Sequence, residues 1–284
     1  MQRSILPKVY GKRDPWVHKG RYGRLALICG SERHTGSACF AGMSAYRAGA
    51  DLVYVIAPER AADVAANFSP VLMTTPLPGP SLTRKHENTV LGVLREVKAT
   101  AAVVGPGLWR EKETLRAITR LVSRIRIPMV LDADAIRGVG ALRRKPKLQN
   151  CVYTPHAAEF KELTGASVGP DLNTRTARVQ QEAAKLRAVI LLKGHVDVIS
   201  DGDTTFWNWT GSPFMTKGGL GDTLTGICGA YLARGVDPLT AACAAAYVNG
   251  KAGSLASMRL GESLLPTDLM DYIQYAIRPS TTLV

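Results

Sequence analysis

Five short apolar segments recur along the chain and are separated by stretches of helical length. They cover residues 25–30, 52–58, 101–106, 128–134 and 189–194. They are apolar at successive positions rather than at alternate ones, which is typical of strands that helices cover on both faces. Their alternation with Ala-, Leu- and Arg-rich segments predicts an α/β fold, a three-layer α/β/α sandwich with a mostly parallel central sheet.

The composition indicates one globular domain over residues 1–284. Hydrophobic residues make up 46% of the chain and charged residues 21%, which are ordinary values for a globular protein. The sequence shows no Pro-, Gly- or Ser-rich linker and no repeat period. Its apolar runs are too short to span a membrane, and its first residues lack an apolar core of signal-peptide length. We therefore expect a cytoplasmic protein with no membrane partner.

The net charge does not by itself identify a partner. A formal charge of +13 and a pI near 9.7 fit nucleic-acid binding, a site for a polyanionic nucleotide, or a merely basic surface. The basic residues are dispersed except at residues 143–147, which we expect to form a solvated loop. Because no aromatic residues are interleaved with that cluster, we expect no nucleic-acid partner.

The cysteines and histidines do not suggest a metal site. The five cysteines form no C-x-x-C pair, and their apolar neighbours predict small buried hydrophobic residues. The histidines show no spacing typical of metal ligands. We expect neither a zinc site nor a disulfide framework.

A glycine-rich loop, residues 217–222, leads into a strongly patterned helix. The apolar residues that follow at helical spacing are Leu224, Ile227, Cys228, Tyr231 and Leu232. Upstream, Asp201-Gly202-Asp203 lies between two strand-like pieces and predicts a β-hairpin. We therefore expect a helix that begins at the glycines, directly after an extended arm.

Backbone amides at the start of this helix could bind an anion. They lack intrahelical partners and lie at the positive end of the helix dipole, and Gly219 and Gly221 would let the bare backbone approach a phosphate. The loop matches neither the P-loop pattern nor the dinucleotide fingerprint. Asp222 then has two interpretations. It is either a helix cap or a general base that takes a proton from a hydroxyl during phosphoryl transfer.

Two other segments place polar side chains after buried strands. Asp132 and Asp134 are expected to end one strand, at the edge of the sheet where α/β folds bind ligands. After another strand, Thr154 is predicted to cap a helix, so that His156 and Glu159 share a face of its first turn. This pair is either a surface or capping pair or a ligand-facing one.

Taken in order, these segments resemble the ADP/ATP-dependent NAD(P)H-hydrate dehydratase family of the ribokinase-like superfamily. The resemblance runs from His18 to Leu269 and includes the motifs VVGPGL, VLDADAI, YTPHAAEFKELTG, VILLKG and TGSPFMTKGGLGDTLTG. It implies a lyase of metabolite repair that restores NADH or NADPH from the S epimer of its hydrate. ADP or ATP would phosphorylate the ring hydroxyl, and loss of phosphate would restore the dihydronicotinamide.

The resemblance also implies site residues. Asp222 would be the catalytic base, and the amides around Gly219 and Gly221 would hold the transferring phosphate. The hydrated dinucleotide would contact Gly36, Ser37, Gly107, His156 and Asp222. The adenine nucleotide would border Lys193, Gly194, His195, Val196, Asp197 and Gly221. Mg2+ would bridge phosphates near Asp134 and Glu159 through water.

The chain departs from the family pattern at several positions. Ser37 stands where alanine is usual, and Trp109 stands where glycine is usual. The segment 193–197 replaces a loop of small residues and threonine, and Lys217 and Leu220 replace threonines beside the glycines. Lys217 either adds a cation next to the phosphates or lies outside the site.

Two other functions fit the same residues. A small-molecule kinase of the superfamily, such as a hydroxyethylthiazole-type kinase, would use the same base and anion site but release a phosphorylated product. A non-catalytic nucleotide-binding regulatory module would keep the fold, although the presence of Gly219, Gly221 and Asp222 argues against it. The Ala- and Gly-rich C-terminal helices and the resemblance lead us to expect a homo-oligomer, such as a tetramer.

Overall fold

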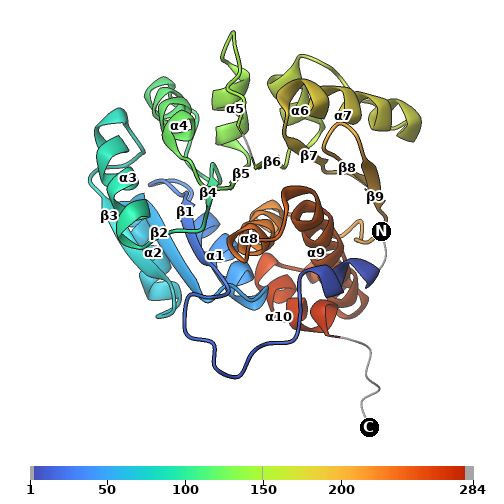
Figure 1. Ribbon diagram of the computed structural model, residues 1–284, viewed down its shortest axis with the longest axis horizontal. Helices are drawn as coiled ribbons and strands as arrows, with labels where there is room; N and C mark the ends of the chain where they lie inside the picture. Colours follow the sequence, from blue (N-terminus) through green and yellow to red (C-terminus); the bar gives the residue numbers. More distant parts are fainter. Residues whose placement is uncertain (1–2, 149, 279–284) are drawn as a thin grey trace.

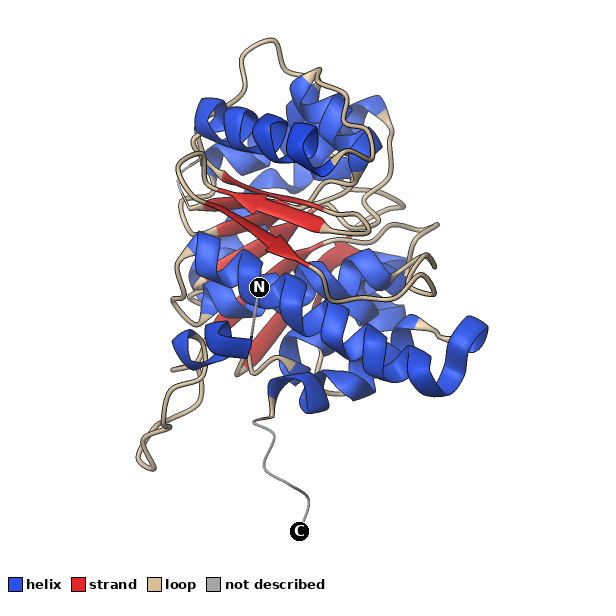
Figure 2. Cartoon of the chain, turned by 90° about the vertical axis from the view of Figure 1, so that its right-hand side faces the viewer, coloured by secondary structure: helices blue, strands red, loops and turns tan. Residues whose placement is uncertain are grey.

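A twisted nine-stranded sheet forms the centre of the molecule, and helices cover both of its faces (Figures 1 and 2). The structure is a computed structural model that describes residues 3–148 and 150–278. The strands are β1 (Arg24–Ile28), β2 (Leu52–Pro58), β3 (Met73–Leu77), β4 (Ala101–Val104), β5 (Met129–Leu131), β6 (Cys151–Tyr153), β7 (Val189–Leu192), β8 (Asp197–Ser200) and β9 (Thr205–Asn208). This arrangement confirms the predicted α/β class.

The order of the strands across the sheet is β3-β2-β1-β4-β5-β6-β7-β8-β9. Strands β1 to β7 pair in parallel, whereas β8 and β9 pair antiparallel as the predicted hairpin. The chain order runs outward in one direction from β1 and in the other from β4. Ligand crevices in α/β sheets lie at such a switch point, outside the carboxyl ends of the strands.

Within the part of the chain that the structure describes, five helices pack on each face of the sheet. One face carries α1 (Gly36–Arg47), α2 (Glu59–Phe68), α8 (Leu220–Ala233), α9 (Pro238–Leu260) and α10 (Pro266–Ile277). The other carries α3 (Glu87–Glu96), α4 (Lys112–Arg124), α5 (Asp134–Gly140), α6 (Ala157–Thr164) and α7 (Leu172–Leu186). Short 3-10 turns are η1 (Arg3–Lys8), η2 (Arg84–His86) and η3 (Gly261–Ser263). Figure 1 shows the two helical layers on opposite sides of the strands.

Burial on both faces explains why the strands lack a polar alternation. Leu25 and Leu27 of β1 pack in the core beneath α8, and Ala26 and Ile28 pack in the core on the opposite face. All five predicted segments are strands of the sheet, and four of them end two or three residues earlier than predicted. They end early because the chain turns out of the sheet there to reach the next helix or hairpin.

Helix α8 begins at the glycines, as the sequence predicts. The helix begins at Leu220, directly after the glycines, with Gly219 as its N-cap. The next helix, α9, begins with Asp237 as N-cap, and the Asp237 carboxylate accepts a hydrogen bond of 2.9 Å from the Thr240 amide. Both helices are rich in small residues and pack against each other; α8 also packs against α1, and α9 also packs against α10.

The remaining sequence expectations concern the surface and the cysteines. The basic segment 143–147 lies in the loop between α5 and β6, as predicted. All five cysteines are buried and free, which confirms their prediction as small core residues. Within residues 3–148 and 150–278, no helix combines the length and the apolarity needed to cross a membrane.

Candidate functional site

Asp222 lies in the first turn of α8, as the third residue of the helix. Gly219 holds the N-cap position with a φ of +93°, and a Cβ there would lie 2.7 Å from the Phe40 ring and 2.9 Å from Pro266. Only glycine fits this approach and this backbone conformation without strain. Asp222 is therefore not the residue at the N-cap, and the N-cap carries no side-chain hydrogen bond.

The Asp222 carboxyl is unusually difficult to ionise. Burial and the nearby negative charge of Asp132 raise its pKa to about 7, although a hydrogen bond from Ser37 and the positive charge of Lys193 lower it. A carboxyl with a pKa near neutrality can exchange a proton at physiological pH. This property suits a general base.

Asp132 accepts hydrogen bonds from several of the polar side chains around Asp222. Its side chain is almost fully buried, and three elements bond to it. Thr154 Oγ1 donates to Asp132 Oδ1 over 2.8 Å, and Thr225 Oγ1 of α8 donates to Oδ2 over 3.0 Å. The Lys193 ammonium donates to Oδ1 over 2.9 Å. Through these bonds, Asp132 connects α8 to the carboxyl edge of the sheet. A buried charge is stable only with hydrogen-bond partners of this kind.

Lys193 places a positive charge beside the glycine loop. Its Nζ lies 3.8 Å from Glu159 Oε2 and would lie 3.6 Å from a Cβ on Gly221. Burial lowers the pKa of Lys193, but the carboxylates of Asp132 and Glu159 outweigh that effect and raise it above the ordinary value. The ammonium is therefore charged next to the first amides of α8, where a phosphate would bind.

Three residues predicted to contact the dinucleotide lie together at the switch point. Gly36 and Ser37 begin α1, with Thr35 as the N-cap. Gly107 lies in the loop after β4, and a Cβ there would lie 2.7 Å from Ser37 Oγ. Ser37 in turn is near enough to Asp222 to lower the pKa of that carboxyl. Gly107, Ser37 and Asp222 thus form a continuous set of neighbours.

The prediction that Thr154 caps α6 is wrong. The N-cap is His156, whose Nδ1 accepts hydrogen bonds from the amides of Ala158 and Glu159 over 3.1 and 3.2 Å. The Glu159 carboxylate accepts from the His156 amide over 2.9 Å, which completes a capping box. Thr154 could not cap the helix because its hydroxyl bonds to Asp132. His156 is half exposed, so one side of its ring faces solvent at the edge of the site.

The second acid, Asp134, is not at the end of a strand as predicted. Strand β5 ends at Leu131, and Asp134 is the first residue of α5. Its Oδ2 accepts from the Trp109 amide over 2.9 Å, and its Oδ1 lies 3.1 Å from Arg137 Nη1. Arg137 also lies 3.8 Å from Glu159 Oε1. Asp134 and Glu159 are therefore bridged by one guanidinium.

The oxygen donors of Asp134 and Glu159 fit a metal held through water rather than directly. Both Asp134 oxygens already accept hydrogen bonds from Trp109 and Arg137. Mg2+ keeps several of its waters and binds through few carboxylates when phosphates supply the other ligands. Among the described residues, no group of three or more His, Cys, Asp or Glu side chains is arranged to hold a metal ion.

The segment 193–197 connects β7 to β8. Gly194 and His195 are exposed, whereas Val196 is buried. The Asp197 carboxylate accepts from the Gly194 amide and from Asn208 Nδ2, each over 3.0 Å. Burial raises the pKa of Asp197 to about 6. Asp197 thus holds the turn and the hairpin, and any nucleotide contact of this segment would be made by Lys193, His195 or backbone groups.

The two unusual residues of the glycine loop are explained by packing. Lys217 Nζ donates to the backbone carbonyl of Glu262 in η3, so its charge holds the C-terminal segment. Leu220 is buried in the core beneath the sheet. Of the two alternatives for Lys217, the structure favours a position outside the phosphate site.

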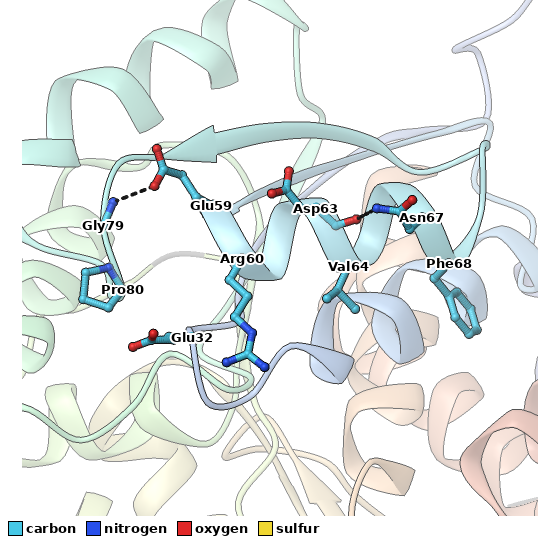
Figure 3. A pocket seen from close by; sticks show the side chains of 9 residues that line it. All are labelled: Glu32, Glu59, Arg60, Asp63, Val64, Asn67, Phe68, Gly79 and Pro80. Atoms are coloured by element: carbon cyan, nitrogen blue, oxygen red, sulfur yellow. Dashed lines mark hydrogen bonds between the residues drawn. The ribbon is translucent and has the colours of Figure 1, made fainter.

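A separate cavity of about 890 Å³ lies between α2 and the loops after β1 and β3 (Figure 3). Its lining residues are Glu32, Glu59, Arg60, Asp63, Val64, Asn67, Phe68, Gly79 and Pro80. The Glu59 carboxylate accepts from the Gly79 amide over 3.4 Å and connects α2 to the loop after β3. None of the predicted site residues lines this cavity.

Sequence reasoning missed Thr225 and Arg137. The three-residue spacing of Asp134 and Arg137 in one helix was a usable signal for that pair. Thr225 gave no signal, because its bond to Asp132 joins positions that are far apart in the chain.

Known proteins are similar to this chain over most of its length. A family model described as NAD(P)H-hydrate dehydratase matches residues 25–275. A bifunctional NAD(P)H-hydrate repair enzyme of Pyrobaculum aerophilum is 43% identical over 262 residues, which are 92% of this chain and 51% of that protein. The chain therefore spans about half the length of such bifunctional relatives. An ADP-dependent (S)-NAD(P)H-hydrate dehydratase of Cenarchaeum symbiosum is 36% identical, over 98% of this chain and 94% of its own.

Solved structures with the same fold include two with clear sequence similarity. A ribokinase-like superfamily protein of Enterococcus faecalis has a TM-score of 0.84 at 25% identity, over 98% of this chain and 94% of its own. The ADP/ATP-dependent NAD(P)H-hydrate dehydratase of Bacillus subtilis, co-crystallized with ATP and Mg2+, has a TM-score of 0.79 at 28% identity, over 95% and 94%. These matches confirm the predicted ribokinase-like fold.

Proposed function

Because the chain belongs to the NAD(P)H-hydrate dehydratase family, we propose that it uses ADP or ATP to dehydrate the S epimer of hydrated NADH or NADPH. The product is the intact reduced cofactor, so the reaction is a metabolite repair. The observation that carries this proposal is the position of Asp222. A carboxyl with a pKa of about 7 lies in the first turn of α8, beside the amides that follow Gly219.

In the first step, Asp222 takes the proton of the ring hydroxyl. The hydroxyl oxygen then bonds to the terminal phosphorus of the donor, and the bond between that phosphorus and the rest of the nucleotide breaks. The amides around Gly219 and Gly221 stabilise the negative charge on the transferring group. Lys193, next to Gly221, adds a positive charge at the same place.

In the second step, the phosphate leaves with the electron pair of its bond to the ring carbon. The adjacent ring carbon gives a proton to solvent water, and the electron pair of that C–H bond forms the ring double bond again. Phosphorylation is needed because hydroxide is a poor leaving group and phosphate is a good one. Each turnover yields one molecule of NADH or NADPH, one inorganic phosphate and a nucleotide with one phosphate fewer.

Mg2+ would lie near Asp134 and Glu159, held through water, as the donor set of these two carboxylates allows. When bound, it would neutralise charge on the phosphates of the donor. The residues of the chain perform the remaining tasks, which are to orient the hydroxyl, hold the phosphate and accept the proton.

The two substrates occupy opposite sides of Asp222 in this proposal. The donor lies near Lys193 and the turn that follows it, and the hydrated dinucleotide lies near Gly36, Ser37, Gly107 and His156. Members of a homo-oligomer, such as a tetramer, would each carry one such site.

The proposal is tested by supplying hydrated NADH together with ADP or ATP and following the absorbance of reduced nicotinamide. Recovery of that absorbance, with one phosphate released per cofactor restored, is the expected result. A run with each donor alone identifies which one is used. A phosphorylated product without recovery would instead identify a small-molecule kinase, and nucleotide binding without any turnover would identify a regulatory module.

A further inference from the structure

We propose that Trp109, backed by His34 and Arg33, forms a platform that binds a ring of the hydrated dinucleotide beside the carboxyl ends of β1 and β4. This inference rests on the proposed function, and it names a part of the site that the sequence alone did not assign.

The platform lies at the switch point of the sheet. His34 belongs to the loop after β1, and Trp109 belongs to the loop after β4, the neighbouring strand. The two loops are tied together, since the Gly30 amide donates to the Pro106 carbonyl over 2.8 Å. Ligands of α/β folds bind in the crevice between two such loops.

Trp109 holds an unusual backbone conformation. Its φ is +81°, in the left-handed region that bulky residues rarely adopt. Its amide donates to Asp134 Oδ2 over 2.9 Å, which fixes the residue in this conformation. Such outliers gather at ligand sites, where the surrounding structure maintains them. Glycine would adopt this conformation freely, so the indole itself needs an explanation.

The indole ring stacks with two neighbours that are open to solvent. Its centroid lies 4.9 Å from that of the His34 ring, with the planes tilted by 36°. The Arg33 guanidinium lies 5.2 Å from the Trp109 centroid. His34 and Arg33 are exposed, and Trp109 is only partly buried. The cluster therefore combines an aromatic surface with a positive charge, which suits a planar ring joined to phosphates.

The platform is close to the reacting groups. A Cβ on Gly107 would lie 2.9 Å from His34 Cβ and 2.7 Å from Ser37 Oγ, and Ser37 is near enough to Asp222 to lower its pKa. Gly107 and Ser37 thus lie between the platform and the proposed base. The platform therefore adjoins Gly107 and Ser37, which the proposed function places against the dinucleotide, and it is assigned to that substrate.

Trp109→Gly tests the platform without straining the fold, because glycine accepts the positive φ. The probe is NADH, the stable product, titrated by calorimetry into the full chain, with ADP as the second ligand. Loss of one aromatic stacking contact is expected to weaken NADH binding by about threefold to tenfold. ADP affinity should change less than about twofold, and Trp109→Phe should keep most of the NADH affinity.

Trp16→Gly is the matched control, since Trp16 is 93% exposed in the loop before β1. It should leave the affinity for NADH unchanged. Unchanged NADH affinity in Trp109→Gly, while the wild type restores NADH from its hydrate, would overturn the platform alone. An equal loss of ADP affinity would also overturn it. A wild type that neither binds NADH nor restores it would overturn both the platform and the proposed function.

Discussion

Asp222→Asn is expected to stabilise the protein at alkaline pH. Burial and the charge of Asp132 raise the pKa of Asp222 from 3.8 to about 7 in the folded state. The folded protein therefore holds this proton up to about pH 7, whereas the unfolded chain releases it near pH 4. By linkage, the free energy of unfolding falls as the pH rises between these two values. At 1.36 kcal/mol per pH unit, the full cost is about 4 kcal/mol above pH 7.

Asparagine has no charge to bury, so the variant avoids this cost. Urea unfolding of both proteins at about pH 5 and about pH 8.5 isolates the effect, because all other titrating groups are shared. The stability gained by Asp222→Asn should be larger at the higher pH by roughly 2 to 3 kcal/mol. A gain that is equal at both pH values, or a variant that is less stable at the higher pH, would refute the assigned electrostatics of Asp222.

Two further predictions concern the surroundings of Asp222 and the packing of its helix. Asp132→Asn removes a negative charge near Asp222, so the acid limb of the pH–rate profile should move down by about one pH unit. Gly226→Ala should lower the free energy of unfolding by about 2 to 3 kcal/mol, because a Cβ there would lie 2.0 Å from the Ala41 carbonyl oxygen. The control, Gly92→Ala, has no atom within 4 Å of the new Cβ and should be neutral or slightly stabilising in thermal unfolding.

The strands that could be predicted from the sequence are those buried on both faces. Segments 101–104 and 189–192 are apolar throughout because helices cover both sides of them. Strand β3 gave no comparable signal. It reads Met-Thr-Thr-Pro-Leu, lies at one end of the sheet, and is only partly buried. An edge strand needs fewer apolar residues, so its composition resembles that of a loop.

The site could be predicted where local chemistry decides the structure. Glycines before an apolar helical face place Asp222 at a helix start, and an acid after a buried strand places Asp132 at the edge of the sheet. The bonds that Thr154 and Thr225 make to Asp132 depend on how distant elements pack. The same packing explains the error at α6. Thr154 is a good capping residue locally. Its hydroxyl instead donates a hydrogen bond to Asp132, because a buried carboxylate is costly without such partners.

Turnover of Asp222→Asn tests the central claim most directly. If Asp222 is the base, the variant should restore NADH from its hydrate at least about 100-fold more slowly than the wild type. Its affinity for ADP or ATP, measured by calorimetry, should remain within about threefold, since the amides and Lys193 still hold the phosphates. Turnover near that of the wild type would contradict the claim.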